Sequence, residues 1–178
     1  MTDKILIQHY LGWDESALER LLEKHLQNIF SACYRVCLDE TDANDISQNV
    51  LIKIIKNLKK FWFKSEFSTW YYRIAYNESI NFLKKKKWHV DIDEIENSLP
   101  YHEDVWKHID QKILNTQVTA EINKLSLIER NIILYFYYDD LKIKEISEIT
   151  DLNENTVKTK LSRAKKKLKH NLAALWKN

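Results

Sequence analysis

Residues 42–77 read DANDISQNVLIKIIKNLKKFWFKSEFSTWYYRIAYN, and this stretch decides how the chain is organised. Its first half repeats an apolar residue every four positions, at Ile46, Val50, Ile54 and Leu58. This spacing predicts an amphipathic helix whose apolar stripe, widened by Leu51 and Ile55, lies on a core. Thr41 or Asp42 is expected to cap that helix by accepting a backbone N–H.

The second half of the stretch is crowded with aromatic side chains and cations. The aromatic residues are Phe61, Trp62, Phe63, Phe67, Trp70, Tyr71 and Tyr72, interleaved with Lys59, Lys60, Lys64 and Arg73. One helical face cannot bury so many rings, so some are expected on the surface beside the cations, where nucleobases stack in single-strand-binding proteins. The other interpretation is a helix junction whose rings fill a core, because aromatic side chains are mostly buried.

Composition and charge predict an all-α protein of two small helical domains. One Gly and one Pro in 178 residues leave little material for hairpins or Gly-rich phosphate loops. Residues 88–106 contain no Lys or Arg, whereas six acidic residues and the single proline, Pro100, lie there. We therefore expect domains at 1–88 and 108–178, joined by an acidic linker at 89–107.

The second half of the chain predicts four helices, and the last two form a helix-turn-helix. These helices are expected over 105–122, 127–138, 143–150 and 154–175. The last of them carries an apolar stripe at Val157, Leu161, Ala164 and Leu168, and its other faces are basic. Two short helices joined by a three-residue turn, the second one basic, are typical of major-groove DNA recognition.

Positions on the last helix suggest how it would meet DNA. Residues near its N-terminus, Asn155, Lys158 and Thr159, are placed for base edges. Lys165 and Lys169, further along, are better placed for phosphates. The block Lys84, Lys85 and Lys86, at the end of a helix predicted over 69–86, is either another phosphate contact or a solvated lysine tail.

Two motifs, DAxDIxQxV at 42–50 and FSTWxYRIAxN at 67–77, resemble region 2 of the extracytoplasmic-function (ECF) sigma factors. These are small promoter-specificity subunits of bacterial RNA polymerase. The resemblance implies that Asp42, Asp45 and Gln48 contact the clamp helices of the largest polymerase subunit. Asn49 stands where the family often has Glu, which weakens that contact by one charge. The resemblance also implies a site for the -10 element and the melted strand at Lys53, Phe61, Trp62, Phe63, Phe67, Trp70, Arg73 and Asn77.

A third motif, LxIxEIxEIxxLxxxTVKxxLxRAK at 141–165, resembles sigma region 4, which reads the -35 promoter element. It implies DNA contacts by Asn155, Thr156, Lys158, Thr159, Ser162, Arg163 and Lys166. Asp151 replaces the family's usual Gly in the turn, and Asp tolerates the left-handed conformation better than most residues. Ser147 replaces a usual Ala. The resemblance further implies contact with the flap of the second-largest polymerase subunit, and an anti-sigma partner.

The sequence offers no pattern for catalysis, a metal or a cofactor. Its six histidines are scattered, and Cys33 and Cys37 are expected to be buried, reduced thiols. Two cysteines and no signal-peptide pattern lead us to expect a soluble cytoplasmic protein with no membrane insertion. An autonomous helix-turn-helix regulator is the alternative. It would bind duplex DNA unaided, but it leaves the aromatic segment without a role.

Overall fold

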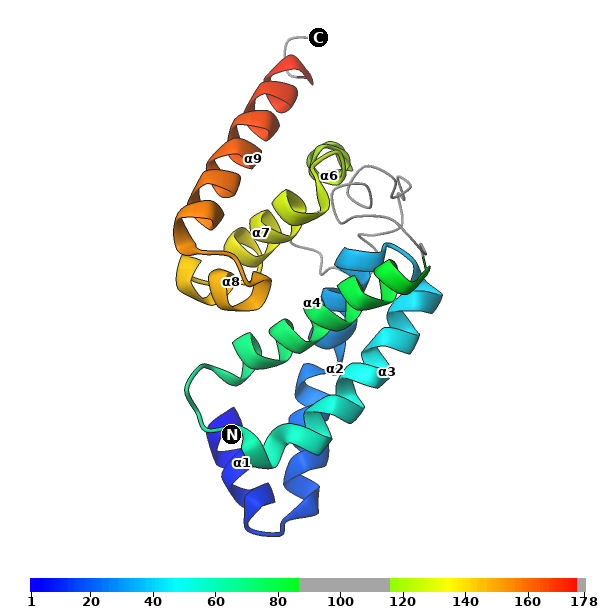
Figure 1. Ribbon diagram of the computed structural model, residues 1–178, viewed down its shortest axis with the longest axis vertical. Helices are drawn as coiled ribbons and strands as arrows, with labels where there is room; N and C mark the ends of the chain where they lie inside the picture. Colours follow the sequence, from blue (N-terminus) through cyan, green and yellow to red (C-terminus); the bar gives the residue numbers. More distant parts are fainter. Residues whose placement is uncertain (87–115, 176–178) are drawn as a thin grey trace. The chain divides into compact units, whose positions relative to one another are not determined.

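The computed structural model describes residues 1–86 and 116–175, in which every regular element is a helix (Figure 1). The chain divides into two compact units, Met1–Phe82 and Leu83–Asn178. The all-α expectation is confirmed. The expected linker at 89–107 and the first part of the helix expected over 105–122 lie outside the described residues, so the domain boundaries stay a prediction.

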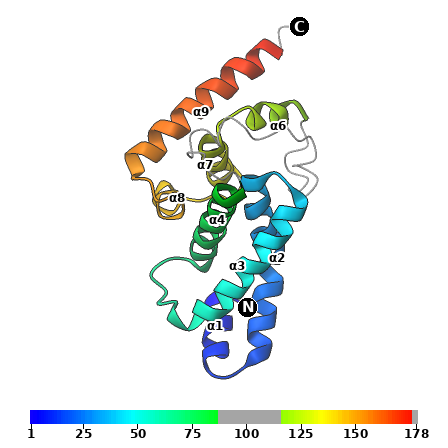
Figure 2. The same ribbon diagram turned by 45° about the vertical axis from the view of Figure 1, so that its right-hand side comes forward.

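The first unit is built around a long central helix. Its elements are α1 (Asp3–Leu11), α2 (Glu15–Cys37), α3 (Glu40–Asn57), the 3-10 turn η1 (Leu58–Lys60) and α4 (Phe67–Lys86). α2 packs against both α1 and α3, as Figures 1 and 2 show from two directions. Asp3 ties α1 to α2, because its Oδ1 lies 2.7 Å from Lys24 Nζ.

The start of α3 corrects the expected cap. Asp39, and neither Thr41 nor Asp42, is the N-cap, and its Oδ1 accepts the Asp42 backbone N–H at 2.8 Å. The reason is the tight link from α2, which ends at Leu38 in the left-handed conformation (φ 57°). Asp39 is then the single extended residue between two helices, and its short carboxylate reaches the orphan N–H groups.

The apolar stripe of α3 is confirmed, but its expected width is wrong. Ile46, Val50, Ile54 and Leu58 are all buried. Ile55, which was expected to widen the stripe, is 38% exposed, and Ile52 is 47% exposed. A helix advances about 100° per residue, so these two isoleucines turn away from α2 and toward solvent.

The interior of the first unit holds two free cysteines. Cys33 and Cys37, one helical turn apart on α2, are both buried and unbridged, as expected. Burial raises the pKa of the Cys33 thiol to about 12 and that of Cys37 to about 11. Both are therefore neutral thiols at ordinary pH, and they act as small packing groups.

The second unit packs three helices against a fourth. They are α6 (Thr116–Asn123), α7 (Leu127–Tyr137), α8 (Ile143–Thr150) and α9 (Glu154–Leu175), and α9 contacts each of the others. α7 is buried along its whole inner length, including Glu129, whose carboxylate lies 2.7 Å from Lys167 Nζ of α9. A second polar link joins the helices where Asn171 donates to Glu121 at 2.8 Å.

The turn between α8 and α9 has the expected chemistry. Asp151 takes the left-handed conformation (φ 57°). Asn153 caps α9, because its Oδ1 accepts the Thr156 N–H at 2.8 Å. Ser147 fits the position where Ala was expected, and its hydroxyl donates to the Leu152 carbonyl. The turn is therefore held by side chains at both ends, which fixes the angle at which α9 leaves it.

Candidate nucleic-acid and polymerase interfaces

The aromatic segment forms a cluster centred on Phe61. The centroid of the Phe61 ring lies 5.1 Å from those of Phe63 and Trp70, and 5.9 Å from that of Phe67. Phe61 is 7% exposed and Phe67 is 4% exposed. These two rings are thus part of the core, and their predicted part in the -10 site stays a prediction.

Other rings of the same segment stay at the surface. Trp62 is 79% exposed and Phe63 is 39% exposed. Phe63 has φ 53°, a conformation that costs energy for any residue with a Cβ. Both interpretations of the segment are therefore partly right, since one layer of rings fills the core and another lies exposed upon it.

α4 supplies a polar edge to this cluster. Trp70, Arg73 and Asn77 are spaced by three and four residues, which puts them on one face of the helix. Trp70 is half-buried, whereas Arg73 and Asn77 are exposed. Lys53 reaches α4 from α3, and its Nζ contacts the carboxylate of Glu78. The structure thus brings Lys53 next to the residue that follows Asn77.

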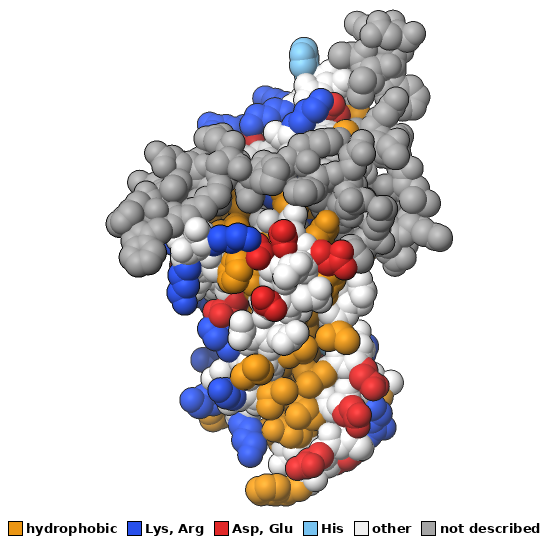
Figure 3. Space-filling model, turned by 90° about the vertical axis from the view of Figure 1, so that its right-hand side faces the viewer, with side chains coloured by type: hydrophobic (Ala, Val, Ile, Leu, Met, Phe, Trp, Pro, Cys, Tyr) orange, Lys and Arg blue, Asp and Glu red, His pale blue; other side chains and the backbone are white. Residues whose placement is uncertain are grey.

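The exposed face of α3 carries the predicted polymerase contacts. Asp45 and Gln48 are exposed and Asp42 is half-buried. Ile52 and Ile55 continue the same face, four and seven residues after Gln48. Figure 3 shows hydrophobic side chains gathered on one face of this unit, with acidic side chains along one border. Sequence reasoning missed the two isoleucines, although the alternation of charged, amide and apolar residues at helical spacing was the available signal.

α4 ends in exposed lysines. Lys84, Lys85 and Lys86 occupy its last turn and are all exposed. Cations in this position complement the negative end of the helix dipole. The same side chains are accessible to an anionic partner.

Most of the predicted duplex-reading residues of α9 lie at the surface. Asn155, Lys158, Thr159, Ser162, Arg163 and Lys166 are exposed. Thr156 is only half-buried, and its hydroxyl donates to the capping Asn153 Oδ1 at 3.0 Å. Asn155, Thr156, Thr159, Lys160 and Arg163 line a shallow hollow at the start of the helix. Lys158 Nζ lies 3.9 Å from Glu154, a loose surface pair that offers little resistance to a change of partner.

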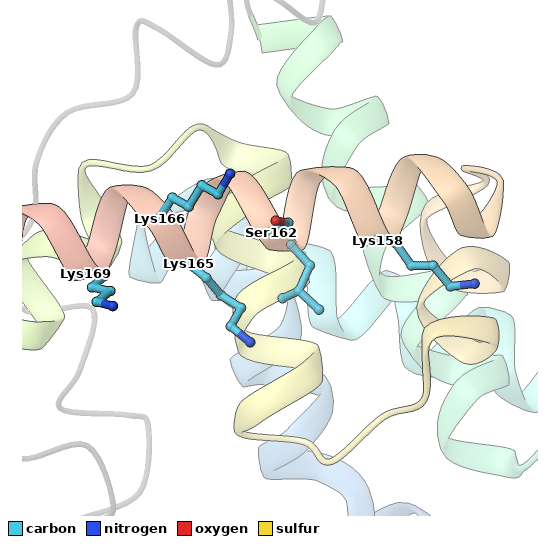
Figure 4. A pocket seen from close by; sticks show the side chains of 6 residues that line it. Lys158, Ser162, Lys165, Lys166 and Lys169 are labelled. Atoms are coloured by element: carbon cyan, nitrogen blue, oxygen red, sulfur yellow. The ribbon is translucent and has the colours of Figure 1, made fainter.

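Lysines line a second hollow further along α9. Figure 4 shows Lys158, Lys165 and Lys169 extending from one side of the helix, and Lys166 from another. Ser162 and Leu161 complete the lining. Four lysines along one stretch of helix suit a chain of phosphates better than a base edge, because Lys acts as a point charge.

An apolar groove lies beside this basic surface. Val118 and Ile122 of α6, Ile133, Leu134 and Tyr137 of α7, and Tyr138, Lys165 and Leu168 line a cavity of about 380 Å³. Lys165 Nζ lies 5.7 Å from the centroid of the Tyr137 ring, which is 55% exposed. Sequence reasoning did not identify this groove. The run Tyr137-Tyr138 at the end of a buried helix was its only signal.

Within the described residues, no group of three or more His, Cys, Asp or Glu side chains is placed to hold a metal ion. No helix in the same residues is long and apolar enough to cross a membrane.

Comparison with known proteins identifies the family. A family model for Sigma-70 region 2 matches residues 21–89, and one for Sigma-70 region 4 matches residues 116–168. The ECF RNA polymerase sigma factor SigW of Bacillus subtilis is 30% identical over 172 residues, covering 91% of this chain and 92% of SigW. This chain belongs to the ECF sigma factors.

Other relatives agree with this membership. The RNA polymerase sigma factor SigV of Bacillus subtilis is 31% identical over 154 residues, covering 85% of this chain and 89% of SigV. The ECF sigma-E factor of Escherichia coli K12 is 27% identical over 186 residues, covering 98% of this chain and 96% of the Escherichia coli protein. CnrH, solved in complex with the cytosolic domain of CnrY, has the same fold with a TM-score of 0.68 at 19% identity, covering 97% of each chain. In this sigma factor α1 and the first turns of α2 lie outside the residues that the two family models match.

Proposed function

We propose that this sigma factor binds core RNA polymerase, directs it to the -10 and -35 elements of its promoters and helps to melt the DNA. The observation that carries the proposal is the pairing of two nucleic-acid surfaces of different chemistry. One unit offers exposed aromatic rings beside cations, which suits unpaired bases. The other offers a capped, basic helix after a tight turn, which suits duplex DNA. A regulator that binds duplex alone needs only the second surface.

In this proposal the first unit holds the melted -10 strand. The exposed rings of Trp62 and Phe63 stack with bases, and the buried rings of Phe61 and Phe67 support them from behind. Trp70, Arg73 and Asn77 line the edge, and Lys53 exchanges Glu78 for a phosphate. Extruding a base costs a few kcal/mol, and aromatic stacking together with a cationic groove offsets that cost.

The exposed face of α3 is the proposed contact with the clamp helices of the largest polymerase subunit. Asp42, Asp45 and Gln48 supply acceptors for a basic partner. Ile52 and Ile55 extend the same face with apolar area, which is a common composition for the centre of a protein interface. Asn49 supplies no charge, and its side-chain amide donates to the Asp45 carbonyl at 3.1 Å.

The second unit is the proposed reader of the -35 element. Asn155, Lys158, Thr159, Ser162, Arg163 and Lys166 face the major groove, while Thr156 holds the helix start through Asn153. Lys165 and Lys169 contact phosphates, and so do Lys84, Lys85 and Lys86 at the end of α4. Phosphate contacts set position and affinity, whereas base-edge contacts set sequence.

The apolar groove between α6, α7 and α9 is the proposed seat for the flap of the second-largest polymerase subunit. Its lining of Val118, Ile122, Ile133 and Leu168 suits the apolar face of a partner helix. A sigma factor, RpoE of Bartonella quintana, has been solved in complex with the anti-sigma factor NepR, and it matches this fold with a TM-score of 0.67 at 19% identity over 87% of this chain. We infer an anti-sigma partner for this chain too, bound to its apolar surfaces.

The proposal also fixes the domain roles and the cellular setting. Residues 1–88 act as the region 2 domain, 108–178 as the region 4 domain, and 89–107 as the acidic linker, so limited proteolysis is expected to cut within the linker first. The protein acts in the cytoplasm, where polymerase and promoters are. It has no enzymatic activity of its own and needs no cofactor.

Run-off transcription tests this function. Bacterial core polymerase is combined with the full chain on a library of host promoter regions, and discrete new transcripts are expected. Asn77→Ala and Phe61→Ala are expected to reduce the amount of these transcripts. Trp62→Ala, a surface variant that leaves the core intact, is compared with them. Binding to duplex DNA without polymerase, in the absence of transcripts, would favour the autonomous regulator.

A further inference from the structure

Trp13, in the turn between α1 and α2, combines backbone strain with almost complete exposure. Its φ is 73°, in the left-handed region, and its side chain is 88% exposed. The turn is held in place, because the N–H groups of Gly12, Trp13 and Asp14 donate to the last carbonyls of α1 at 3.0–3.1 Å. A left-handed position at a helix end is normally occupied by Gly or Asn.

Leu38, Asp140 and Asp151, three other left-handed residues, have a structural explanation that Trp13 lacks, whereas Phe63 is, like Trp13, a strained and exposed aromatic residue. Asp140 and Asp151 belong to a residue type that tolerates this conformation. Leu38 is strained too, but its side chain is 4% exposed and contributes to the core. The fold gains almost no burial from the Trp13 indole. What the position supplies is therefore the exposed ring itself.

The ring is held next to a cation that belongs to the aromatic segment. Lys59 Nζ, in η1, lies 5.4 Å from the centroid of the Trp13 ring. Three residues after Lys59 comes Trp62, which is 79% exposed, and then the strained Phe63. The cation beside Trp13 therefore comes from the same short segment of chain as the exposed rings already assigned to the melted strand.

Acidic groups near Trp13 do not cancel this cationic character. Asp14, the next residue, accepts the Ser16 hydroxyl at 2.6 Å and lies 3.6 Å from Arg20 Nη2. His9 Nδ1 lies 3.7 Å from the same carboxylate. The negative charge is engaged on the α2 side, while the Trp13 ring faces Lys59.

We propose that Trp13 and Lys59 form a second stacking site for a nucleobase of the unpaired promoter strand, in addition to the Trp62–Phe63 surface. The indole face takes the base and the Lys59 ammonium takes the adjoining phosphate. This inference rests on the proposed function. It adds a contact from a segment outside both family regions, and it lengthens the stretch of single strand that the first unit can hold.

Binding of assembled holoenzyme to a fork-junction promoter fragment tests the site. The fragment is duplex through the -35 element and single-stranded from the -10 element onward, and its promoter comes from the transcription experiment. Trp13→Gly removes the ring and relieves the backbone, and Trp13→Tyr keeps a stacking face. Leu11→Ala, an exposed apolar residue of the same helix end, is the matched control.

The expected result separates a ligand role from a structural one. Trp13→Gly weakens fork binding roughly 5-fold or more, the loss typical of one stacked base. Its thermal midpoint is unchanged or raised, because the left-handed strain is gone. Trp13→Tyr and Leu11→Ala bind like the wild type. Lys59→Gln lowers the slope of log affinity against log salt by about 0.7, as for one phosphate on a single strand.

Two results would overturn the proposal. One is fork binding by Trp13→Gly that equals the wild type. The other is a loss explained wholly by weaker assembly with core polymerase, measured without DNA, which would make Trp13 a protein contact. If the wild-type holoenzyme itself does not bind the fork, the proposed function is wrong, and the Trp13 site that rests on it is wrong as well.

Discussion

Lys53 Nζ, on α3, contacts the carboxylate of Glu78, on α4, at the edge of the aromatic cluster. In this pair Glu78 binds the Lys53 ammonium group that we assign to the melted strand. Lys53 is half exposed, so exchange of Glu78 for a phosphate costs little, as for other surface pairs. The contact therefore acts as a built-in competitor for the nucleic acid.

Glu78→Gln is expected to release Lys53 and to strengthen fork-junction binding by the holoenzyme about 2- to 5-fold, the range of a surface ion pair. Lys53→Gln is expected to weaken it by a similar factor. Thermal unfolding of either variant should stay close to that of the wild type. Equal binding by all three proteins would remove Lys53 from the strand site.

Sequence patterns predicted those parts of the fold where local chemistry and packing agree. The stripe of α9, the left-handed Asp151 and the Asn153 cap all depend on neighbours in the chain, and all three are present. The burial of Phe61 and Phe67 could not be predicted from local sequence in the same way. Which rings of a crowded segment turn inward depends on α2, which approaches from elsewhere in the sequence and places the His25 ring 5.3 Å from that of Phe67.

The cap of α3 and the outer face of the same helix were missed for related reasons. Asp39 caps α3 because Leu38 adopts a left-handed conformation. Burial of the Leu38 side chain stabilises that conformation, which leucine does not favour by itself. Ile55 lies outside because α2 covers too narrow an arc of α3 to bury it. Both errors arise where tertiary packing overrides a local rule.

The left-handed Asp151 makes the helix-turn-helix sensitive to side-chain branching. Asp151→Val is expected to destabilise the second unit by roughly 1–2 kcal/mol, because a β-branched residue clashes in this conformation. Asp151→Asn, which tolerates it, is the control. Chemical denaturation of the full chain measures the difference, and duplex binding by holoenzyme should fall with stability. A Val variant as stable as the Asn variant would contradict the assigned turn.

The Glu129–Lys167 pair is expected to set the docking of α9 on α7. Glu129 is buried and also accepts the Ser126 hydroxyl at 3.2 Å. Lys167→Ala removes its charged partner and should lower the free energy of unfolding by about 1–2 kcal/mol, the usual loss for a charged hydrogen bond. Lys169→Ala, two residues along the same helix and exposed, should leave stability nearly unchanged. The comparison is made by urea unfolding at fixed pH, and equal losses in both variants would contradict the pairing.

The buried thiols on α2 should make stability fall at alkaline pH. Burial raises the pKa of Cys33 to about 12 and of Cys37 to about 11, so the folded state keeps their protons where the unfolded chain releases them. This contribution is complete below the unfolded thiol pKa of about 8.5, and it is lost as the pH rises toward the folded values. Between those limits, wild-type protein should lose stability with pH faster than a Cys33→Ala, Cys37→Ala variant. The variant carries the same lysines and tyrosines, so the difference in slope isolates the thiols.

Thiol-reagent labelling at pH 8 should likewise be slow in the native protein and rapid in denaturant, and rapid native labelling would contradict the burial of these groups.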